Sequence, residues 1–203
     1  MEQYPSILGS SKAPLGVPVI AFYKYDGSNL RWEWSPKQGW HKFGTRTQLM
    51  DKTDPIFGQA IPLFHRISDE ILERARKYER GLQRLTVFTE FFGPSSFAGV
   101  HVQDEPKELR LIDAYLFKRG MMPPRQFLKV FGNLPYAAQV IYEGNLNQQF
   151  IDNVRKGMYP VWEGVVCKGE DSRGKPFMVK IKTDAYFKKL NEVYGTQYRL
   201  YWE

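Results

Sequence analysis

A lysine interrupts the first long apolar segment of the chain, in the stretch FYKYDGSNLRW that begins at Phe22. If this segment is a strand, the alternation of side chains puts Lys24 and Asp26 on the face of Ile20 and Phe22. A strand that packs on both faces offers no favourable place for an ammonium group. Lys24 therefore either lies at the solvated end of a sheet or takes part in a reaction.

Two more lysines share one face of a second apolar segment, FMVKIK at 177–182. Lys180 and Lys182 are two positions apart, so in a strand they lie on one side, about 7 Å apart at the backbone. Two ammonium groups at that separation repel each other unless an anion or water lies over them. The pair is either the solvated face of an edge strand or a site for an anion.

Two further apolar segments, TVFTEFF and VWEGVVCK, each contain a glutamate. Glu90 is expected among phenylalanines, and Glu163 is expected on the face of Val165 and Cys167. A carboxylate among apolar side chains is costly to bury without a donor or a cation. Each glutamate is either a satisfied structural residue or part of a functional site.

These residue types suit one reaction. A lysine that is buried or flanked by cations loses its proton more easily, and a neutral amine is a nucleophile that forms covalent enzyme intermediates. A further pair of lysines can bind phosphate oxygens, and carboxylates can hold Mg²⁺. An aromatic side chain can stack on a base. The set predicts attack by a lysine on a nucleoside triphosphate.

Short alternating apolar runs with helices between them must position these residues. Strands are predicted at 17–24, 29–35, 40–46, 84–92, 109–117, 138–143, 161–168 and 177–182. Helices are predicted after the caps Ser68, Asn147 and Thr183 or Asp184, with a fourth beginning at the Pro123–Pro124 pair. This irregular mixture predicts an α+β fold with mostly antiparallel sheets and flanking helices.

The composition narrows the class of protein. A formal net charge of +7 favours polyanionic partners, with nucleic acid first. No apolar run approaches the roughly 20 residues of a membrane span, so no membrane partner is expected. The only cysteine is Cys167, which fits a reducing compartment. We expect a monomer in the cytoplasm, or in the host cytoplasm if the source is a virus.

The order of five motifs resembles that of the covalent nucleotidyltransferases, which include polynucleotide ligases and mRNA capping guanylyltransferases. The motifs are KYDG (24–27), FTEFFG (88–93), LRLIDAYLF (109–117), EGVV (163–166) and KIK (180–182). Within this superfamily, Ser28 and Asn29 after the first motif and GTRTQ (44–48) are similar to RNA ligases of the bacteriophage T4 RNA ligase 2 type. The resemblance implies the ATP-grasp-like ligase fold and a single nucleotidyltransferase domain over 1–203, without a C-terminal OB-fold or helical domain.

The resemblance also implies a role for each motif residue. Lys24 attacks the α-phosphate of ATP to form lysyl-AMP, and Asp26, where the T4 type has a histidine, orients the lysine or a metal-bound water. Asn29 and Arg46 contact phosphate. The AMP then passes to a 5′-phosphate end, and a 3′-hydroxyl displaces it to seal the strand.

The remaining roles concern the nucleotide and the metal. Glu90 accepts hydrogen bonds from the ribose, and Glu163 binds Mg²⁺, or Mn²⁺ in its place, directly or through water. Lys180 and Lys182 neutralise the α-phosphate, and Lys182 helps to lower the pKa of Lys24. The stacking position of the family falls on Leu109, so either Leu109 or Phe92 packs on the base.

Three alternatives remain open at the level of sequence. The acceptor could be DNA, or the reaction could be guanylyl transfer to mRNA. The chain could also be a basic, non-catalytic nucleic-acid-binding module, in which Trp32, Trp34 and Trp40 interleave with Lys and Arg as stacking platforms. The structural explanation of these tryptophans is a packed hairpin.

Overall fold

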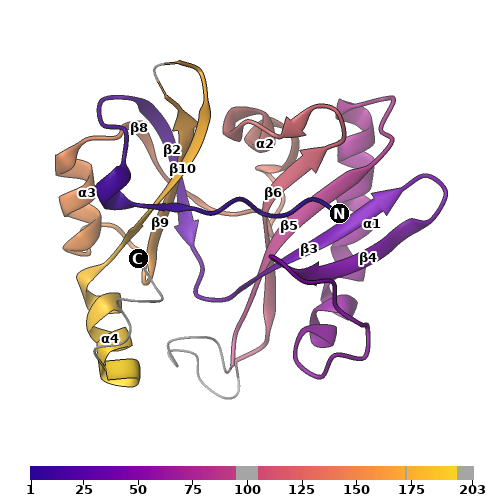
Figure 1. Ribbon diagram of the computed structural model, residues 1–203, viewed down its shortest axis with the longest axis horizontal. Coiled ribbons are helices and arrows are strands. Elements are labelled where there is room, and N and C mark those ends of the chain that lie inside the picture. Colours follow the sequence, from indigo (N-terminus) through magenta and orange to yellow (C-terminus); the bar gives the residue numbers. More distant parts are fainter. Residues whose placement is uncertain (95–104, 172, 196–203) are drawn as a thin grey trace. The chain divides into compact units, whose positions relative to one another are not determined.

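A computed structural model describes residues 1–94, 105–171 and 173–195. The described chain divides into two compact units, each with its own sheet. The first unit contains residues 1–5, 27–94 and 105–138, and the second contains 6–26, 139–171 and 173–195. Figure 1 shows the elements of both units. That residues 1–203 act as one nucleotidyltransferase domain stays a prediction.

The first unit is built on a five-stranded antiparallel sheet with the order β4-β3-β5-β6-β7. Its strands are β3 (Ser28–Ser35), β4 (Gly39–Thr45), β5 (Leu85–Phe92), β6 (Glu108–Leu116) and β7 (Gly120–Met121). Its helices are the 3₁₀ turn η2 (Phe57–Gln59), α1 (Ala60–Tyr78) and α2 (Pro124–Phe131).

The second unit has a five-stranded sheet with the order β1-β10-β9-β2-β8, in which the β1–β10 pair is parallel and the other three pairs are antiparallel. Its strands are β1 (Leu8–Gly9), β2 (Pro18–Lys24), β8 (Val140–Asn145), β9 (Gly164–Glu170) and β10 (Pro176–Lys182). Its helices are the 3₁₀ turn η1 (Ser10–Lys12), α3 (Gln148–Arg155) and α4 (Asp184–Tyr194). The predicted α+β class and mostly antiparallel pairing are confirmed.

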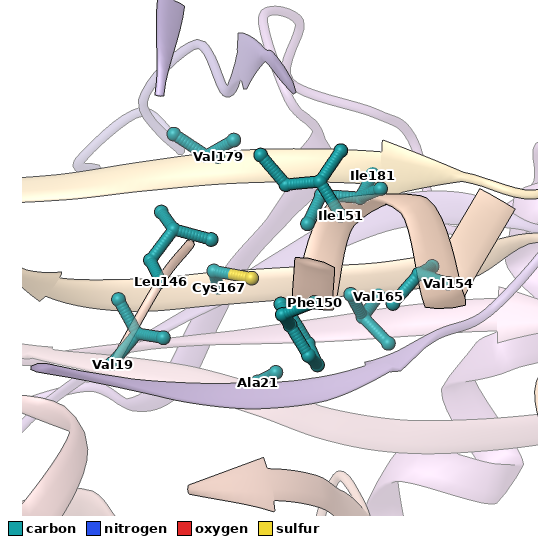
Figure 2. Packing of buried hydrophobic residues seen from close by; sticks show 10 residues of the cluster. All are labelled: Val19, Ala21, Leu146, Phe150, Ile151, Val154, Val165, Cys167, Val179 and Ile181. Atoms are coloured by element: carbon teal, nitrogen blue, oxygen red, sulfur yellow. The ribbon is translucent and has the colours of Figure 1, made fainter. Parts of the chain in front are cut away.

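One face of the second sheet packs on α3 and forms the core of that unit (Figure 2). The buried residues of this core are Val19, Ala21, Leu146, Phe150, Ile151, Val154, Val165, Cys167, Val179 and Ile181. Because side chains alternate along a strand, the residues between these core positions in β2, β9 and β10 point to the other face. That face carries Lys24, Lys180 and Lys182.

The helix caps were predicted with mixed success. The Asn147 side chain accepts a hydrogen bond from the amide of Phe150 (2.8 Å), and Thr183 caps α4 by accepting from the amide of Tyr186 (3.1 Å). The cap at Ser68 was wrong, because α1 begins two turns earlier and Ser68 lies buried within it. The apolar residues Ile61 and Phe64 extend the helical pattern upstream, so the polar Ser68–Asp69 pair was not a boundary.

Among the helices of the described residues, none has both the length and the apolar character needed to cross a membrane.

Candidate active site

Two lysines from different strands converge on one glutamate in the second unit. Lys24 ends β2 and Lys182 ends β10, and both are register partners of Gly164, the first residue of the strand between them. The Glu163 Oε1 atom lies 2.7 Å from Lys24 Nζ and 3.3 Å from Lys182 Nζ. Three sequence-predicted residues therefore form one contact cluster, which we call the lysine–glutamate cluster.

Glu163 reaches these lysines because the strand alternation breaks at Gly164. The predicted placement of Glu163 beside Val165 and Cys167 was wrong, because those two residues lie in the core against α3. Glu163 precedes β9, and the φ of 144° at Gly164 is a conformation that side-chain-bearing residues rarely adopt. A Cβ atom at Gly164 would also overlap the carbonyl oxygen of Ile181. The glycine thus lets β9 and β10 approach closely and turns Glu163 to the lysine face.

Glu163 can accept a cation in addition to the two lysines. Its side chain is 3% exposed, and its Oε2 atom is buried without a hydrogen-bond partner among the described residues. A buried carboxylate oxygen without a donor fits a Mg²⁺ or Mn²⁺ ion, or a water bound to one. Within the described ranges, no group of three or more His, Cys, Asp or Glu side chains gathers to hold a metal. An ion there would take its other ligands from water and phosphate, as Mg²⁺ commonly does.

Burial sets the charge state of Lys182. The side chain is 6% exposed, and burial lowers the pKa of its ammonium group to about 8. Repulsion from Lys24 and Lys180 contributes to this lowering, and attraction to Glu163 opposes it. Near neutral pH, Lys182 is therefore a cation that an additional anion would stabilise.

Tyr186, on the first turn of α4, holds Asp26 in place. The Tyr186 hydroxyl donates a 2.8 Å hydrogen bond to Asp26 Oδ1, and both residues are buried. Burial, with the nearby charges of Glu163 and Asp26, raises the pKa of Tyr186 far above its usual value, so the hydroxyl stays a donor. Lys182 Nζ also lies 5.1 Å from the centroid of the Tyr186 ring. The tyrosine therefore contacts both a carboxylate and a lysine of the site.

A short chain of hydrogen bonds fixes this tyrosine relative to Glu163. The Thr183 hydroxyl caps α4 and donates to the carbonyl of Trp162 (2.7 Å), and the Thr183 amide donates to the carbonyl of Glu163 (3.0 Å). Sequence reasoning gave Thr183 as one of two candidate caps, with Asp184, but missed Tyr186. The buried face of α4 is formed by Tyr186 and Leu190, whereas Tyr194 at the end of the helix is exposed.

Sequence reasoning also missed a fourth lysine on this face. Lys168 is the register partner of Ile20, so it lies on the side of the sheet opposite α3. It is 5% exposed, and its Nζ lies 4.7 Å from the centroid of the Phe22 ring. The alternation that paired Lys180 with Lys182 extends from Gly164 to Lys168 and could have identified it. The face thus carries Lys24, Lys168, Lys180 and Lys182.

The first unit holds the other predicted residues. Asn29 on β3 is the register partner of Glu90 on β5, so their side chains share one face of that sheet. Both polar atoms of the Asn29 amide are buried without a hydrogen-bond partner among the described residues. An amide in that state is suited to a ligand, because burying it unpaired is costly.

The two candidates for base stacking, Phe92 and Leu109, lie on opposite faces of the sheet of the first unit. Phe92 lies two positions from Glu90 and shares its face. Leu109 is the register partner of Phe91, so it lies on the opposite face. If Glu90 contacts the ribose, Phe92 is the better placed of the two.

Arg46 is exposed in the loop that follows β4. The roles that would link these residues to the lysine–glutamate cluster stay predictions.

Comparison with known proteins finds similarity in fold but no match in sequence. No family model matches the sequence, and no curated protein matches it. Solved structures of an RNA ligase from Naegleria gruberi are similar in fold to most of this chain. An apo variant of that ligase aligns with a TM-score of 0.68 and 15% identity over 93% of this chain and 58% of that chain. The same ligase with PPi aligns with a TM-score of 0.64 and 15% identity over 95% and 58% of the two chains.

A variant of that ligase with ATP and Mn aligns with a TM-score of 0.61 and 16% identity, over 87% of this chain and 52% of that chain. The chain therefore spans slightly more than half the length of the solved ligases that it matches. It has the fold of the nucleotidyltransferase domain of RNA ligases, as the order of the motifs predicted.

Proposed function

We propose that this chain is the nucleotidyltransferase part of an ATP-dependent RNA ligase that joins 5′-phosphate and 3′-hydroxyl ends. The observation that carries the proposal is the convergence of Lys24 and Lys182 on the buried carboxylate of Glu163. A structural ion pair needs one cation, whereas a second ammonium group on the same oxygen repels the first and creates a place for an anion. The similar structures that hold ATP and Mn, or PPi, support a triphosphate as that anion.

In the first step, Lys24 acts as the nucleophile. Its ammonium group loses a proton to water, and the free amine forms a bond to the α-phosphorus of ATP while the bond to pyrophosphate breaks and a second proton leaves the nitrogen for water. Lys180 and Lys182 lie on the same face and would stabilise the negative charge on the α-phosphate oxygens. Asp26, fixed by Tyr186, would orient the Lys24 amine or a water beside it.

In the later steps, the lysyl-AMP transfers its nucleotide to RNA. An oxygen of the 5′-phosphate end attacks the AMP phosphorus, and the Lys24 amine leaves. The 3′-hydroxyl of the other end then attacks the activated 5′-phosphate, a phosphodiester forms, and AMP leaves. A bound Mg²⁺ or Mn²⁺ would reduce the repulsion between nucleophile and phosphates, and Glu163 Oε2 would hold it. Asn29, Arg46 and Glu90 would contact the phosphates and the ribose.

A sealing assay tests this function and separates it from its alternatives. The substrate is a nicked duplex with a labelled 5′-phosphate, and the 3′ end is either RNA or DNA. We expect ATP-dependent sealing with an RNA 3′ end, and none with Lys24→Ala. The matched control is Lys156→Ala, which removes an exposed lysine that follows α3 and should seal normally.

Three results would replace the proposal. Equal or better sealing of DNA 3′ ends would make the chain a DNA ligase. Formation of a covalent nucleotide adduct with GTP and not with ATP would favour a capping guanylyltransferase. Nucleic-acid binding without any covalent nucleotide adduct would favour a non-catalytic binding module.

A further inference from the structure

A cavity of about 240 Å³ lies within the first unit, where the β3–β4 hairpin meets α1 and the segment after β4. Its lining includes Trp32, Trp40, Leu49, Lys52, Phe64 and His65. We call this cavity the Trp40 pocket. The proposed ligase chemistry makes no use of it.

Stacked aromatic side chains form the floor of the Trp40 pocket. The Trp32 and Phe64 rings are nearly parallel, with an interplanar angle of 3° and centroids 4.0 Å apart. Trp40 meets the Phe64 ring edge-on, with centroids 4.9 Å apart and an interplanar angle of 89°. Trp32 is 3% exposed, so its stacking capacity is used within the protein. The packed-hairpin explanation therefore holds for Trp32, and for Trp34, which is 4% exposed and lies under the Arg76 guanidinium.

Trp40 differs from the other two tryptophans of the hairpin. It is only half-buried, yet its Nε1 atom is buried and has no hydrogen-bond acceptor among the described residues. A buried indole N–H normally finds an acceptor, because leaving it unpaired is unfavourable. A flat ligand that carries hydrogen-bond acceptors would pair this donor if the half-buried indole ring turned its N–H toward the pocket.

The exposed residues of the pocket lining include one apolar residue, Leu49, and the basic residues Lys52 and His65. Leu49 is 62% exposed, and the loop that carries it is tied to β4 by the hydrogen bond from the Met50 amide to the Phe43 carbonyl (3.0 Å). Lys52 and His65 are exposed lining residues, and among the residues that the structure describes no acidic one lines the pocket. This combination matches an uncharged ring attached to a phosphate.

We propose that the Trp40 pocket binds one unpaired nucleobase of an RNA strand, with the adjoining phosphate on Lys52. The proposal rests on the proposed function, because a ligase substrate supplies such a strand, and it adds a single-stranded contact to that substrate. The volume is below the roughly 300–1,000 Å³ of pockets for drug-sized ligands, so the pocket admits a ring system rather than a whole nucleotide. The Trp40 N–H would donate to a carbonyl or ring nitrogen of the base.

Arg46 connects the pocket to the predicted phosphate contacts. It lies three positions before Leu49 in the loop that leaves β4. A strand whose phosphates run past Arg46 and Lys52 would bring a base to the pocket between them. The loop is tightly held at its start, because a Cβ atom at Gly44 would overlap the carbonyl oxygen of Gln48.

Binding of a single-stranded oligoribonucleotide, measured by fluorescence anisotropy, tests the proposal. The test variants are Leu49→Glu and Lys52→Glu, which place a negative charge at the mouth on exposed positions. The matched control is Lys37→Glu, which makes the same charge change as Lys52→Glu in the turn of the same hairpin, outside the lining. We expect both test variants to raise the Kd about 5- to 150-fold, the range for one stacked base, and the control to raise it less than twofold.

An oligonucleotide with a single abasic position supplies the second measurement. We expect one abasic position to weaken binding to the wild-type protein and to have no effect on Leu49→Glu. Equal affinities for all variants, or an equal loss in Lys37→Glu and Lys52→Glu, would overturn the pocket. Covalent labelling of the wild-type protein by ATP needs no RNA, so it reports separately on the proposed function.

Discussion

Substitution of Gly164 by alanine tests how the lysine–glutamate cluster is built. Gly164 pairs with Lys24 on one side and with Lys182 on the other, and its φ is 144°. A Cβ atom would overlap the Ile181 carbonyl oxygen and lie 2.8 Å from the Lys182 Cα atom. Both obstacles are backbone of the neighbouring strand, which cannot swing away as a side chain can.

Two contributions determine the size of the effect. A residue forced into a glycine-only conformation costs about 1–3 kcal/mol. Overpacking a closely fitted site costs about 1–3 kcal/mol more. Gly164→Ala should therefore lower the free energy of unfolding by about 2–6 kcal/mol. Gly157→Ala is the matched control, because Gly157 also has a positive φ (71°) but no atom within 4 Å of the added Cβ, so we expect a loss of about 1–2 kcal/mol.

Urea unfolding followed by circular dichroism measures both losses, and labelling with ATP measures the site. Displacing β10 moves Lys182 relative to Glu163, and a misplacement of about 1 Å can cost about 100-fold in rate. We expect folded Gly164→Ala to be labelled at least tenfold more slowly than Gly157→Ala. Equal losses of stability and equal labelling rates in the two variants would refute the close approach of β9 and β10 as the basis of the cluster.

Three further predictions concern single side chains. Because the pKa of Lys182 is about 8, ATP binding at pH 8 should stabilise the charged form of this lysine, and the protein should take up protons as ATP binds. Calorimetry in two buffers of different ionisation enthalpy measures this proton uptake. The uptake should vanish at pH 6, where Lys182 is already charged, and in Lys182→Met. Tyr186→Phe removes a hydrogen bond to the buried Asp26 and should cost about 1.5–3 kcal/mol in urea unfolding, and an unchanged midpoint would contradict that role. Burial raises the pKa of Cys167 to about 12, so a thiol reagent should label it only after unfolding, and rapid labelling of the native protein would contradict its place in the core.

The strand pattern predicted much of the site because alternation is a local property. It put Lys180 and Lys182 on one face, and the structure pairs their strand with β9, which begins directly after Glu163. Alternation failed at Glu163 because Gly164 adopts a conformation that reverses the side-chain direction. Such a break depends on the packing of β9 against β10, which the local pattern does not contain.

Contacts between distant positions were the other part that sequence patterns did not provide. Tyr186 and Asp26 are 160 positions apart, and nothing in the motif KIKTDAYF predicts their hydrogen bond. The helix α1 was predicted too short because a polar pair within it looked like a cap. The caps at Asn147 and Thr183 were correct because a cap is decided by its own few residues.

The central claim is that the amine of residue 24 takes a nucleotide from ATP. Incubation with ATP and Mg²⁺, followed by peptide mapping by mass spectrometry, tests it without any RNA. The account predicts AMP attached to the Nζ atom of Lys24, and no adduct in Lys24→Ala. An adduct on another lysine, or none on a protein that binds ATP, would contradict it.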